Sequence, residues 1–279
     1  MNQIKILVPT NFTAISYNSI DYAIGLASEL NAELILVHQI TYKDSQFINL
    51  GETEAENTRR YNSATLQLQQ SQKYVKERQP DLKVNVVLNT GPFQYIIEEV
   101  IKSKIDYIVI GTPGDTGIKS VILGSYTSDV ISKSVCPVFT VPPISKYKKI
   151  ENILCATDFH KSEIISINEL IKLSFNFNAS ITFYNVNPDK EKQKIKFDRF
   201  QAKIKDIVGV ESLKYFLSNS SEVVHSIEEY VSEKNPDIIV TLGKRRQLFD
   251  RIFGEHVTKK LSLHTHIPLL SFPSSSSEV

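Results

Sequence analysis

The sequence predicts an α/β fold with two tandem domains, each an open five-stranded parallel sheet with helices on both faces. Short runs rich in Ile, Val and Leu recur through the 279 residues without polar alternation, as expected for parallel strands covered on both sides. Segments with one apolar stripe at helical spacing separate these runs. In addition, motifs of the first half recur in the second half.

The repeat sets the domain boundaries. KILVPTNFT at 5–13 recurs as NILCATDFH at 152–160, an offset of 147 residues, and CPVFTVP at 136–142 recurs as IPLLSFP at an offset of 131. The offset falls because the first half carries more sequence between its second and third strands. A repeat of this length indicates two domains of one kind. We expect domains at 1–143 and 150–273, a linker at 144–149 and a disordered tail at 274–279.

Each half alternates strand and helix. The expected strands are 4–9, 33–39, 83–89, 105–111 and 136–141 in the first half, and 151–156, 180–186, 212–217, 237–242 and 267–272 in the second. The apolar stripes that predict helices are Ile20, Ala23, Ile24 and Ala27; Phe93, Ile96, Ile97, Val100 and Ile101, after Pro92 at a first helical position; and Val223, Val224, Ile227, Tyr230 and Val231. Most of the polar insertion 41–80 is expected to be a solvated helix that follows a mobile loop around 49–54.

Composition restricts the class of partner. A net charge of +1 provides no general attraction to nucleic acid or to an anionic membrane. The chain begins directly with a strand-like segment and contains no run of 18 apolar residues, so we expect a cytoplasmic protein. Cys136 and Cys155 are expected to be buried, inert thiols in strands. The apolar closing strands of the two halves favour an intrachain pseudo-dimer or pairing with a second chain as a homodimer.

A glycine-rich loop is the strongest functional signal. Gly111, Gly114 and Gly124 follow a buried strand, and Ser125 begins a helical stretch. Glycines let backbone N–H groups approach an anion, and a helix N-terminus adds unpaired donors, so this arrangement predicts a phosphate site. The spacing matches neither the Walker loop nor the dinucleotide fingerprint. The alternative is that the loop is only a tight connection between strand and helix.

This glycine spacing, the opening ILVPTNF and the VHQ end of the second strand resemble the universal stress protein family over two tandem copies. The resemblance implies adenine-nucleotide-hydrolase-like domains, with ATP or AMP held by some members between the first and fourth strands. In the first domain it implies a nucleotide site made of Pro9, Thr10, Asn11, Gln39, Gly111, Gly114, Gly124, Ser125, Tyr126 and Thr127. Mg²⁺ would accompany ATP.

The two domains differ at this site. In the first, Asn11 stands where the family usually has Asp, and Asp115 stands where many nucleotide-binding members have a basic residue. The second domain can be aligned with the first in two registers. One register aligns Gly243 with Gly111. The other aligns the closing strands of the two domains and puts Leu242 in the position of the first glycine. The second and third glycines become Arg246 and His256 in the first register, and Arg245 and Glu255 in the other, so only the first domain is expected to bind nucleotide.

The sequence assembles no catalytic group of nucleophile, base and orienting residue. We expect a nucleotide-binding module that acts as a regulatory or partner-binding switch on an unidentified protein. The alternatives are a scaffold without nucleotide and a slow ATPase. His38 is expected to be a satisfied core histidine rather than a base, and His264 and His266 are not expected to hold a metal. The basic residues Lys244, Arg245, Arg246, Arg251, Lys259 and Lys260 are expected to form a solvated face rather than a site for RNA or another anion.

Overall fold

The computed structural model describes residues 3–40, 50–91, 94–112, 125–208, 213–242 and 267–273. The first half contains β1 (Lys5–Pro9), α1 (Ala14–Leu30), β2 (Glu33–Ile40), α2 (Leu50–Arg78), β3 (Val84–Thr90), α3 (Gln94–Lys102), β4 (Tyr107–Gly111), α4 (Ser125–Lys133) and β5 (Val138–Val141). The second half contains β6 (Asn152–Ala156), a 3₁₀ turn (Lys161–Glu163), α5 (Ile164–Phe177), β7 (Ser180–Val186), α6 (Lys190–Val208), β8 (Lys214–Ser218), α7 (Val223–Lys234), β9 (Ile238–Thr241) and β10 (Leu269–Ser271).

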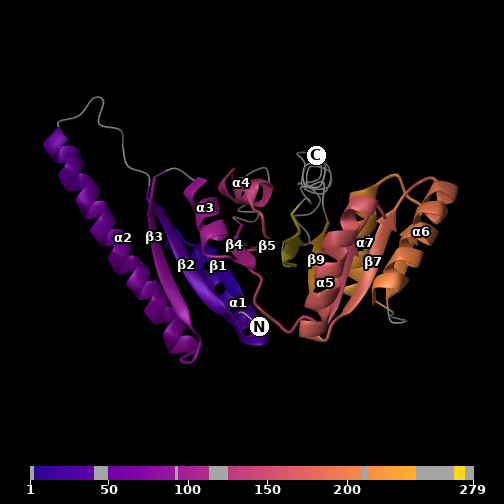
Figure 1. The fold of residues 1–279 in the computed structure, drawn as a ribbon, viewed down its shortest axis with the longest axis horizontal. Coiled ribbons are helices and arrows are strands. Elements are labelled where there is room, and N and C mark those ends of the chain that lie inside the picture. Colours follow the sequence, from indigo (N-terminus) through magenta and orange to yellow (C-terminus); the bar gives the residue numbers. More distant parts are fainter. Residues whose placement is uncertain are drawn as a thin grey trace.

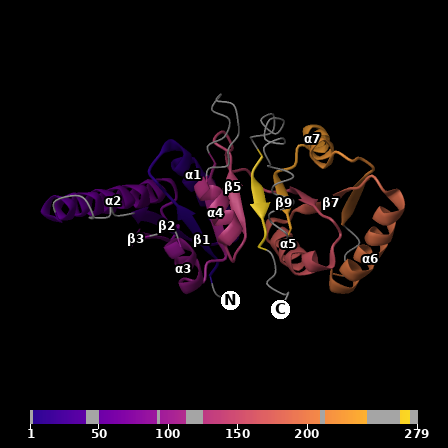
Figure 2. The same ribbon diagram turned by 90° about the horizontal axis from the view of Figure 1, so that it is seen from above.

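The described strands form one sheet of ten strands in the order β3-β2-β1-β4-β5-β10-β9-β6-β7-β8. Within each half all pairs are parallel, and the halves meet where β10 runs antiparallel to β5. Each half is thus the predicted five-stranded parallel sheet, and the closing strands pair with one another. Figure 1 shows the two halves side by side, with α2 at one end and α6 at the other, and Figure 2 shows the same arrangement from above.

Helices cover both faces of the sheet because alternate strand residues point to opposite sides. In β1, Ile6 and Val8 join a core that also holds side chains of α1 and α5 and so runs through both halves. Leu7 belongs instead to a second core with residues of α3 and α4. A third core packs α7 on the second half. Of the side chains described in the long helix α2, only a narrow stripe is buried, as expected for a solvated helix: Ala64, Leu68, Ser71 and Val75.

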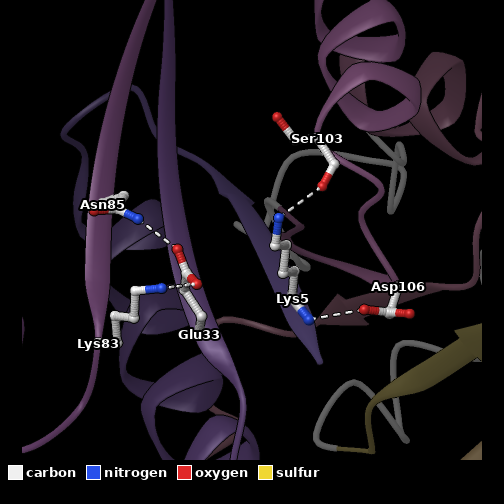
Figure 3. A network of polar contacts seen from close by, with 6 residues as sticks. All are labelled: Lys5, Glu33, Lys83, Asn85, Ser103 and Asp106. Carbon is white, nitrogen blue, oxygen red and sulfur yellow. Dashed lines mark hydrogen bonds and ion pairs between the residues drawn. The ribbon is translucent and has the colours of Figure 1, made fainter. Parts of the chain in front are cut away.

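Polar contacts fasten the amino ends of the strands. Figure 3 shows the Glu33 carboxylate, which is buried at the start of β2, receiving hydrogen bonds from Lys83 (2.6 Å) and from Asn85. Beside them, the backbone N–H of Lys5 donates to the Asp106 carboxylate at 2.8 Å. In the second half the N–H of Asn152 donates to the Asp237 carboxylate at the same distance. The two halves therefore share this contact between a strand-start N–H and an Asp carboxylate, in addition to the sequence repeat.

Segment 144–149, the predicted linker, packs against the first half. The ring of Tyr147 lies over Gly25 of α1, and its hydroxyl donates a hydrogen bond to Glu29. Lys148 forms an ion pair with Asp237 at 2.8 Å, ahead of β9. The segment therefore contacts both halves of the molecule.

The expected loop around 49–54 is wrong from residue 50 onward, because α2 already begins at Leu50. The glycine and polar residues there favour a loop, but Glu56 and Arg60 form an i,i+4 pair at 2.9 Å that supports the helix. The expected strands each overlap an observed one. Pro92 and Phe93, the expected tail 274–279 and the basic cluster lie outside the described residues, as do His264 and His266.

Candidate functional site

A cavity of about 370 Å³ opens at the carboxyl ends of β1, β2 and β4, beside the first turns of α1 and α4. A volume of this size suits a small-molecule ligand. Its described lining is Pro9, Thr10, Asn11, Thr13, Ile15, Ser16, His38, Gln39, Ile110, Gly111 and Thr127. None of these lining residues is a carboxylate or a permanent cation, so the described wall combines apolar groups with a few uncharged polar ones.

The sequence-predicted site residues fall into two groups. The cavity brings together six of them: Pro9, Thr10, Asn11, Gln39, Gly111 and Thr127. Ser125 and Tyr126 begin α4, although their side chains are outside the description, and Gly114 and Gly124 lie outside the described residues. Asp115 also lies there. The structure therefore places the strand-end part of the expected site and does not describe most of the glycine loop.

The turn after β1 forms one wall of the cavity. Thr10 is buried, donates its hydroxyl to Ser16 at 3.1 Å, and accepts the backbone N–H of Phe12 at 3.1 Å. Phe12 has a φ of 64°, a conformation that non-glycine residues adopt rarely. The Asn11 amide oxygen already accepts the N–H and the hydroxyl of Thr13, at 3.3 and 2.7 Å. A ligand hydroxyl would have to share that oxygen.

His38 is a cavity residue that the sequence interpretation assigned to the core. Its Nδ1 lies 2.7 Å from the Thr10 carbonyl oxygen, and its ring packs 4.4 Å from that of Phe12. Because a carbonyl oxygen only accepts, Nδ1 carries the hydrogen of this contact. The ring is therefore held by the strand end, as a core histidine would be, and it also contributes to the wall of the cavity. Its position at the carboxyl end of a parallel strand was the available signal.

Gly111 allows α1 to approach β4 closely. A Cβ added to Gly111 would lie 2.7 Å from Ile15 Cγ2 and 2.8 Å from the Ile15 carbonyl oxygen, both shorter than real contacts. Gly111 also accepts a hydrogen bond at its carbonyl from the hydroxyl of Thr127, at 3.3 Å. The absence of a side chain at residue 111 therefore lets the starts of α1 and α4 meet at the end of one strand.

Two helix N-termini face this region. Thr13 is the N-cap of α1, but its side chain makes no capping hydrogen bond. The other helix, α4, begins at Ser125, directly after the glycine loop. The first N–H groups of a helix have no partner within the helix and carry partial positive charge, so they favour an anionic ligand group.

Sheet register identifies the counterpart of each site residue in the second half. Ile6 pairs with Tyr107, and Ile153 pairs with Ile238, so Gly111 corresponds to Leu242. The closing-strand register is therefore correct, and the alternative that aligned Gly243 with Gly111 is wrong. Leu242 is fully buried in the core. An apolar side chain thus stands where the first half has a glycine.

Glu163 is the counterpart of Ser16. It is buried, and its carboxylate accepts the Thr157 hydroxyl at 2.6 Å and the N–H groups of Asp158 and His160, each at 3.3 Å. Burial raises the pKa of this carboxyl group to about 7, against the opposing effect of those hydrogen bonds. The second half thus holds an acidic group of its own at the position where the first half has a cavity-lining hydroxyl.

The remaining chemistry of the described residues is limited. Cys136 and Cys155 are buried, as expected, although Cys136 lies just before β5 rather than in a strand, and burial raises the pKa of the Cys155 thiol. Within the described ranges no cluster of three or more His, Cys, Asp or Glu side chains is arranged to hold a metal ion. Of the helices that the structure describes, none has the length and apolar character required to cross a membrane.

Comparison with known proteins supports this assignment of the fold. The model of the universal stress protein family matches residues 4–142. Universal stress protein MJ0531 of Methanocaldococcus jannaschii is 32% identical over 142 residues, which cover 49% of this chain and 81% of the relative. The structure of a universal stress protein from Archaeoglobus fulgidus aligns over 98% of this chain and 97% of its own chain, with a TM-score of 0.68 and 16% sequence identity.

The fold alone also occurs in a transporter component. The structure of the cytoplasmic domain of a prokaryotic cation chloride cotransporter aligns over 99% of this chain and 98% of its own chain, with a TM-score of 0.57 and 12% sequence identity. At that identity the likeness concerns the fold and not the function. Both whole-chain likenesses include the two halves together.

Proposed function

The chain belongs to the universal stress protein family, and on that premise we propose that its first half binds an adenine nucleotide in the cavity at the ends of β1, β2 and β4. ATP, ADP and AMP are the candidate ligands. The nucleotide acts as a regulatory signal rather than as a substrate, because the described lining offers hydroxyl, amide and imidazole groups but no nucleophile paired with a base.

The position of the cavity is the observation that carries this proposal. β1 has β2 on one side and β4 on the other, so the chain leaves β1 in one direction across the sheet and later returns to its other side. Such a switch point opens a crevice at the carboxyl ends of parallel strands, where α/β sheets bind ligands. The 370 Å³ cavity lies at this point.

The wall has a chemistry that suits a nucleotide. Ser16 and Thr127 supply hydroxyl groups, and the start of α4 supplies backbone donors for phosphate oxygens. No described lining residue is acidic, so none would repel the phosphates or offer a carboxylate to Mg²⁺. Any Mg²⁺ would therefore be bound mainly by the phosphates of ATP.

The regulatory role follows from where the ligand would lie. A nucleotide between the strand ends and the start of α4 favours whichever of two arrangements of the site binds it better, and a protein partner that contacts the site then senses the nucleotide. This requires a real difference in affinity between the two arrangements. The second half, with Leu242 and Glu163 at the corresponding positions, contributes structure and surface instead of a second site of this kind.

Isothermal titration calorimetry with ATP, ADP and AMP tests the proposal. Ser16→Glu introduces the acidic side chain found at the corresponding position of the second half, and we expect it to remove detectable binding. Ser28→Glu makes the same change on the exposed face of α1 and should bind as the wild type does. Circular dichroism and urea unfolding establish that each variant is folded.

A second variant changes an exposed residue and is therefore less able to disturb folding. Thr13 lies exposed at the rim of the cavity, and Thr13→Glu should weaken ATP binding by about fivefold through charge repulsion of about 1 kcal/mol. AMP, with less charge, should be affected less than ATP. Absence of nucleotide binding by the wild type would reject this site and favour a scaffold without nucleotide. Equal binding by the wild type and both cavity variants would also reject this site and would mean that the nucleotide binds elsewhere.

A further inference from the structure

A pocket between the two halves shares no lining residue with the cavity at the strand ends. Its volume is about 100 Å³, and its wall comes from α1, from segment 144–149 and from the residues directly ahead of β9 and β10. We call it the inter-half pocket; its polar side chains are those of Tyr22, Ser145, Lys146, Lys148 and Asp237. This volume exceeds the minimum of roughly 10–15 Å³ for one water and is below the range from about 300 Å³ upward of most ligand sites. The pocket therefore suits a small polyatomic ion.

Two buried hydroxyl groups in the inter-half pocket are available as donors. Tyr22 and Ser145 are 2% and 4% exposed, and neither hydroxyl makes a hydrogen bond with a residue that the structure describes. Burial and then the charge of Asp237 raise the pKa of the Tyr22 hydroxyl, as expected for a group that faces this wall. The Ser145 N–H donates to the Pro142 carbonyl at 3.1 Å, which fixes the backbone there. Because buried hydroxyls normally have a partner, the occupant of the pocket must accept hydrogen bonds.

The one carboxylate among the lining residues is already used by the protein. Asp237 pairs with the Lys148 ammonium at 2.8 Å. Its other oxygen accepts the backbone N–H groups of Glu151 and Asn152, at 2.9 and 2.8 Å. A carboxylate has about four acceptor positions, so these three contacts leave little capacity for a ligand that donates. The side chains of the pocket therefore offer free donors rather than free acceptors.

Lys146 adds a positive charge that the described residues do not balance. It lines the pocket and is exposed, and its ammonium group forms no ion pair within the described part of the chain. Lys148, in contrast, is balanced by Asp237. Two ammonium groups and one carboxylate leave the lining with an excess of one positive charge. Water could satisfy the hydroxyl groups, but an anion with several oxygens satisfies both the hydroxyls and the charge.

We propose that the inter-half pocket binds a small oxyanion of the size of inorganic phosphate. Tyr22 and Ser145 donate their hydroxyls to its oxygens, and Lys146 supplies the balancing charge. Tyr22 belongs to the first half and Ser145 to the segment between the halves, while the pocket is closed by residues ahead of β9 and β10 of the second half. The anion therefore contacts both halves, and its binding stabilises their packing on segment 144–149. This site does not depend on nucleotide binding in the first half.

Calorimetry of the whole chain with inorganic phosphate, at constant ionic strength in chloride, tests the proposal. Lys146→Gln removes the unbalanced charge and Tyr22→Phe removes one donor while keeping the ring. Each should weaken phosphate binding by about 10-fold or more, the loss expected for a hydrogen bond to a charged group. Lys149→Gln is the matched control, because Lys149 lies on the same segment, outside the pocket lining, with 62% of its side chain exposed. It should bind phosphate as the wild type does.

Hydrogen exchange locates the bound ion and separates this pocket from the cavity at the strand ends. Phosphate should slow exchange of the backbone amides in segment 144–149 and just ahead of β9, and Lys146→Gln should lose this protection while Lys149→Gln keeps it. Protection confined to residues 10–16 and the start of α4 would place the phosphate in the other cavity and overturn the proposal. No phosphate binding by the wild type, or equal binding by the wild type and folded Lys146→Gln and Tyr22→Phe, would also overturn it.

Discussion

Among single residues, Glu163 has a carboxyl group whose buried environment raises its pKa from 4.5 to about 7. Asp158 adds to the rise through charge repulsion, and the three hydrogen bonds from the turn oppose it. Between these two values the folded protein keeps a proton that the unfolded chain releases. The free energy of unfolding therefore falls as the pH increases from about 4.5 to about 7, and this contribution is constant above that range.

Glu163→Gln should remove this pH dependence. A shift of this size corresponds to a cost on the order of 3 kcal/mol for the charged form above pH 7. We therefore expect the stability of the variant, relative to the wild type, to improve by up to about that amount between pH 5 and pH 8. Urea unfolding at the two pH values measures the difference.

The control for this change is an exposed carboxylate. Glu77 on α2 pairs with Lys73 at 3.8 Å with 59% of its side chain exposed, and Glu77→Gln should give a profile parallel to that of the wild type. A profile for Glu163→Gln that also runs parallel would show that the Glu163 carboxyl group titrates as it does in the unfolded chain.

At the scale of elements, helix α1 serves both the cavity and the segment between the halves. Its first turn lines the cavity through Ile15 and Ser16, and its middle receives Tyr147 at Gly25. A Cβ at Gly25 would lie 2.2 Å from Tyr147 Cδ1, a distance that no real contact shows. The ring of Tyr147 also packs edge-to-face on Tyr22 at 5.1 Å. The absence of a side chain at Gly25 thus permits segment 144–149 to lie against the helix.

Gly25→Ala should destabilise the protein although alanine favours helices. The gain in helix propensity is about 1 kcal/mol, whereas displacing a packed aromatic ring costs typically 1–3 kcal/mol and also loses its contacts. We expect a net loss of about 1–2 kcal/mol by urea unfolding. Ser28→Ala, on the exposed face of the same helix, should change stability by less than about 0.5 kcal/mol. An increase in stability with Gly25→Ala would mean that Tyr147 does not rest on α1.

The order of strands and helices could be predicted from the sequence because the spacing of apolar residues within each segment reflects its secondary structure. The ranges expected for β1 and β7, for example, agree with the observed strands to within a residue. The correspondence of Gly111 with Leu242 could not be decided in the same way. Gly243 lies one residue away in sequence, and only the pairing of β9 with β6 shows which residue occupies the strand end.

The cavity was predictable in position but not in its hydrogen bonding. The family resemblance grouped Pro9, Gln39 and Gly111, and a parallel sheet with a switch point does place the ends of β1, β2 and β4 together. The side-chain amide of Gln39 donates to the Gly91 carbonyl, 52 residues away in the chain, and no local pattern encodes that contact. His38 faces the Thr10 carbonyl for the same long-range reason.

At the scale of the whole molecule, the antiparallel pair of β5 and β10 joins the halves into a single sheet. Leu269 lies opposite Thr140, Leu270 opposite Phe139 and Ser271 opposite Val138. An unpaired apolar edge strand would be a site for association with other chains. Here each closing strand protects the other, so the homodimer considered from the sequence would need a surface other than these two edges.

A pair of cysteines tests this arrangement directly. Thr140 and Leu269 are opposite each other and both 4% exposed, and residues opposite in an antiparallel pair have Cβ atoms about 4.5–5.5 Å apart. In a background with Cys136→Ser and Cys155→Ser, Thr140→Cys plus Leu269→Cys should form a disulfide within one chain under mild oxidation, since such spacing is close to that required. Non-reducing electrophoresis should then show a monomer of increased mobility.

The single variants Thr140→Cys and Leu269→Cys provide the controls and should keep the mobility of the reduced protein. Closure of a loop of more than a hundred residues should also raise resistance to urea in the oxidised double variant, by several kcal/mol in the chain-entropy model. Disulfide-linked dimers in place of the fast monomer would indicate that β5 pairs with β10 of a second chain. The continuous sheet would then form between molecules rather than within one.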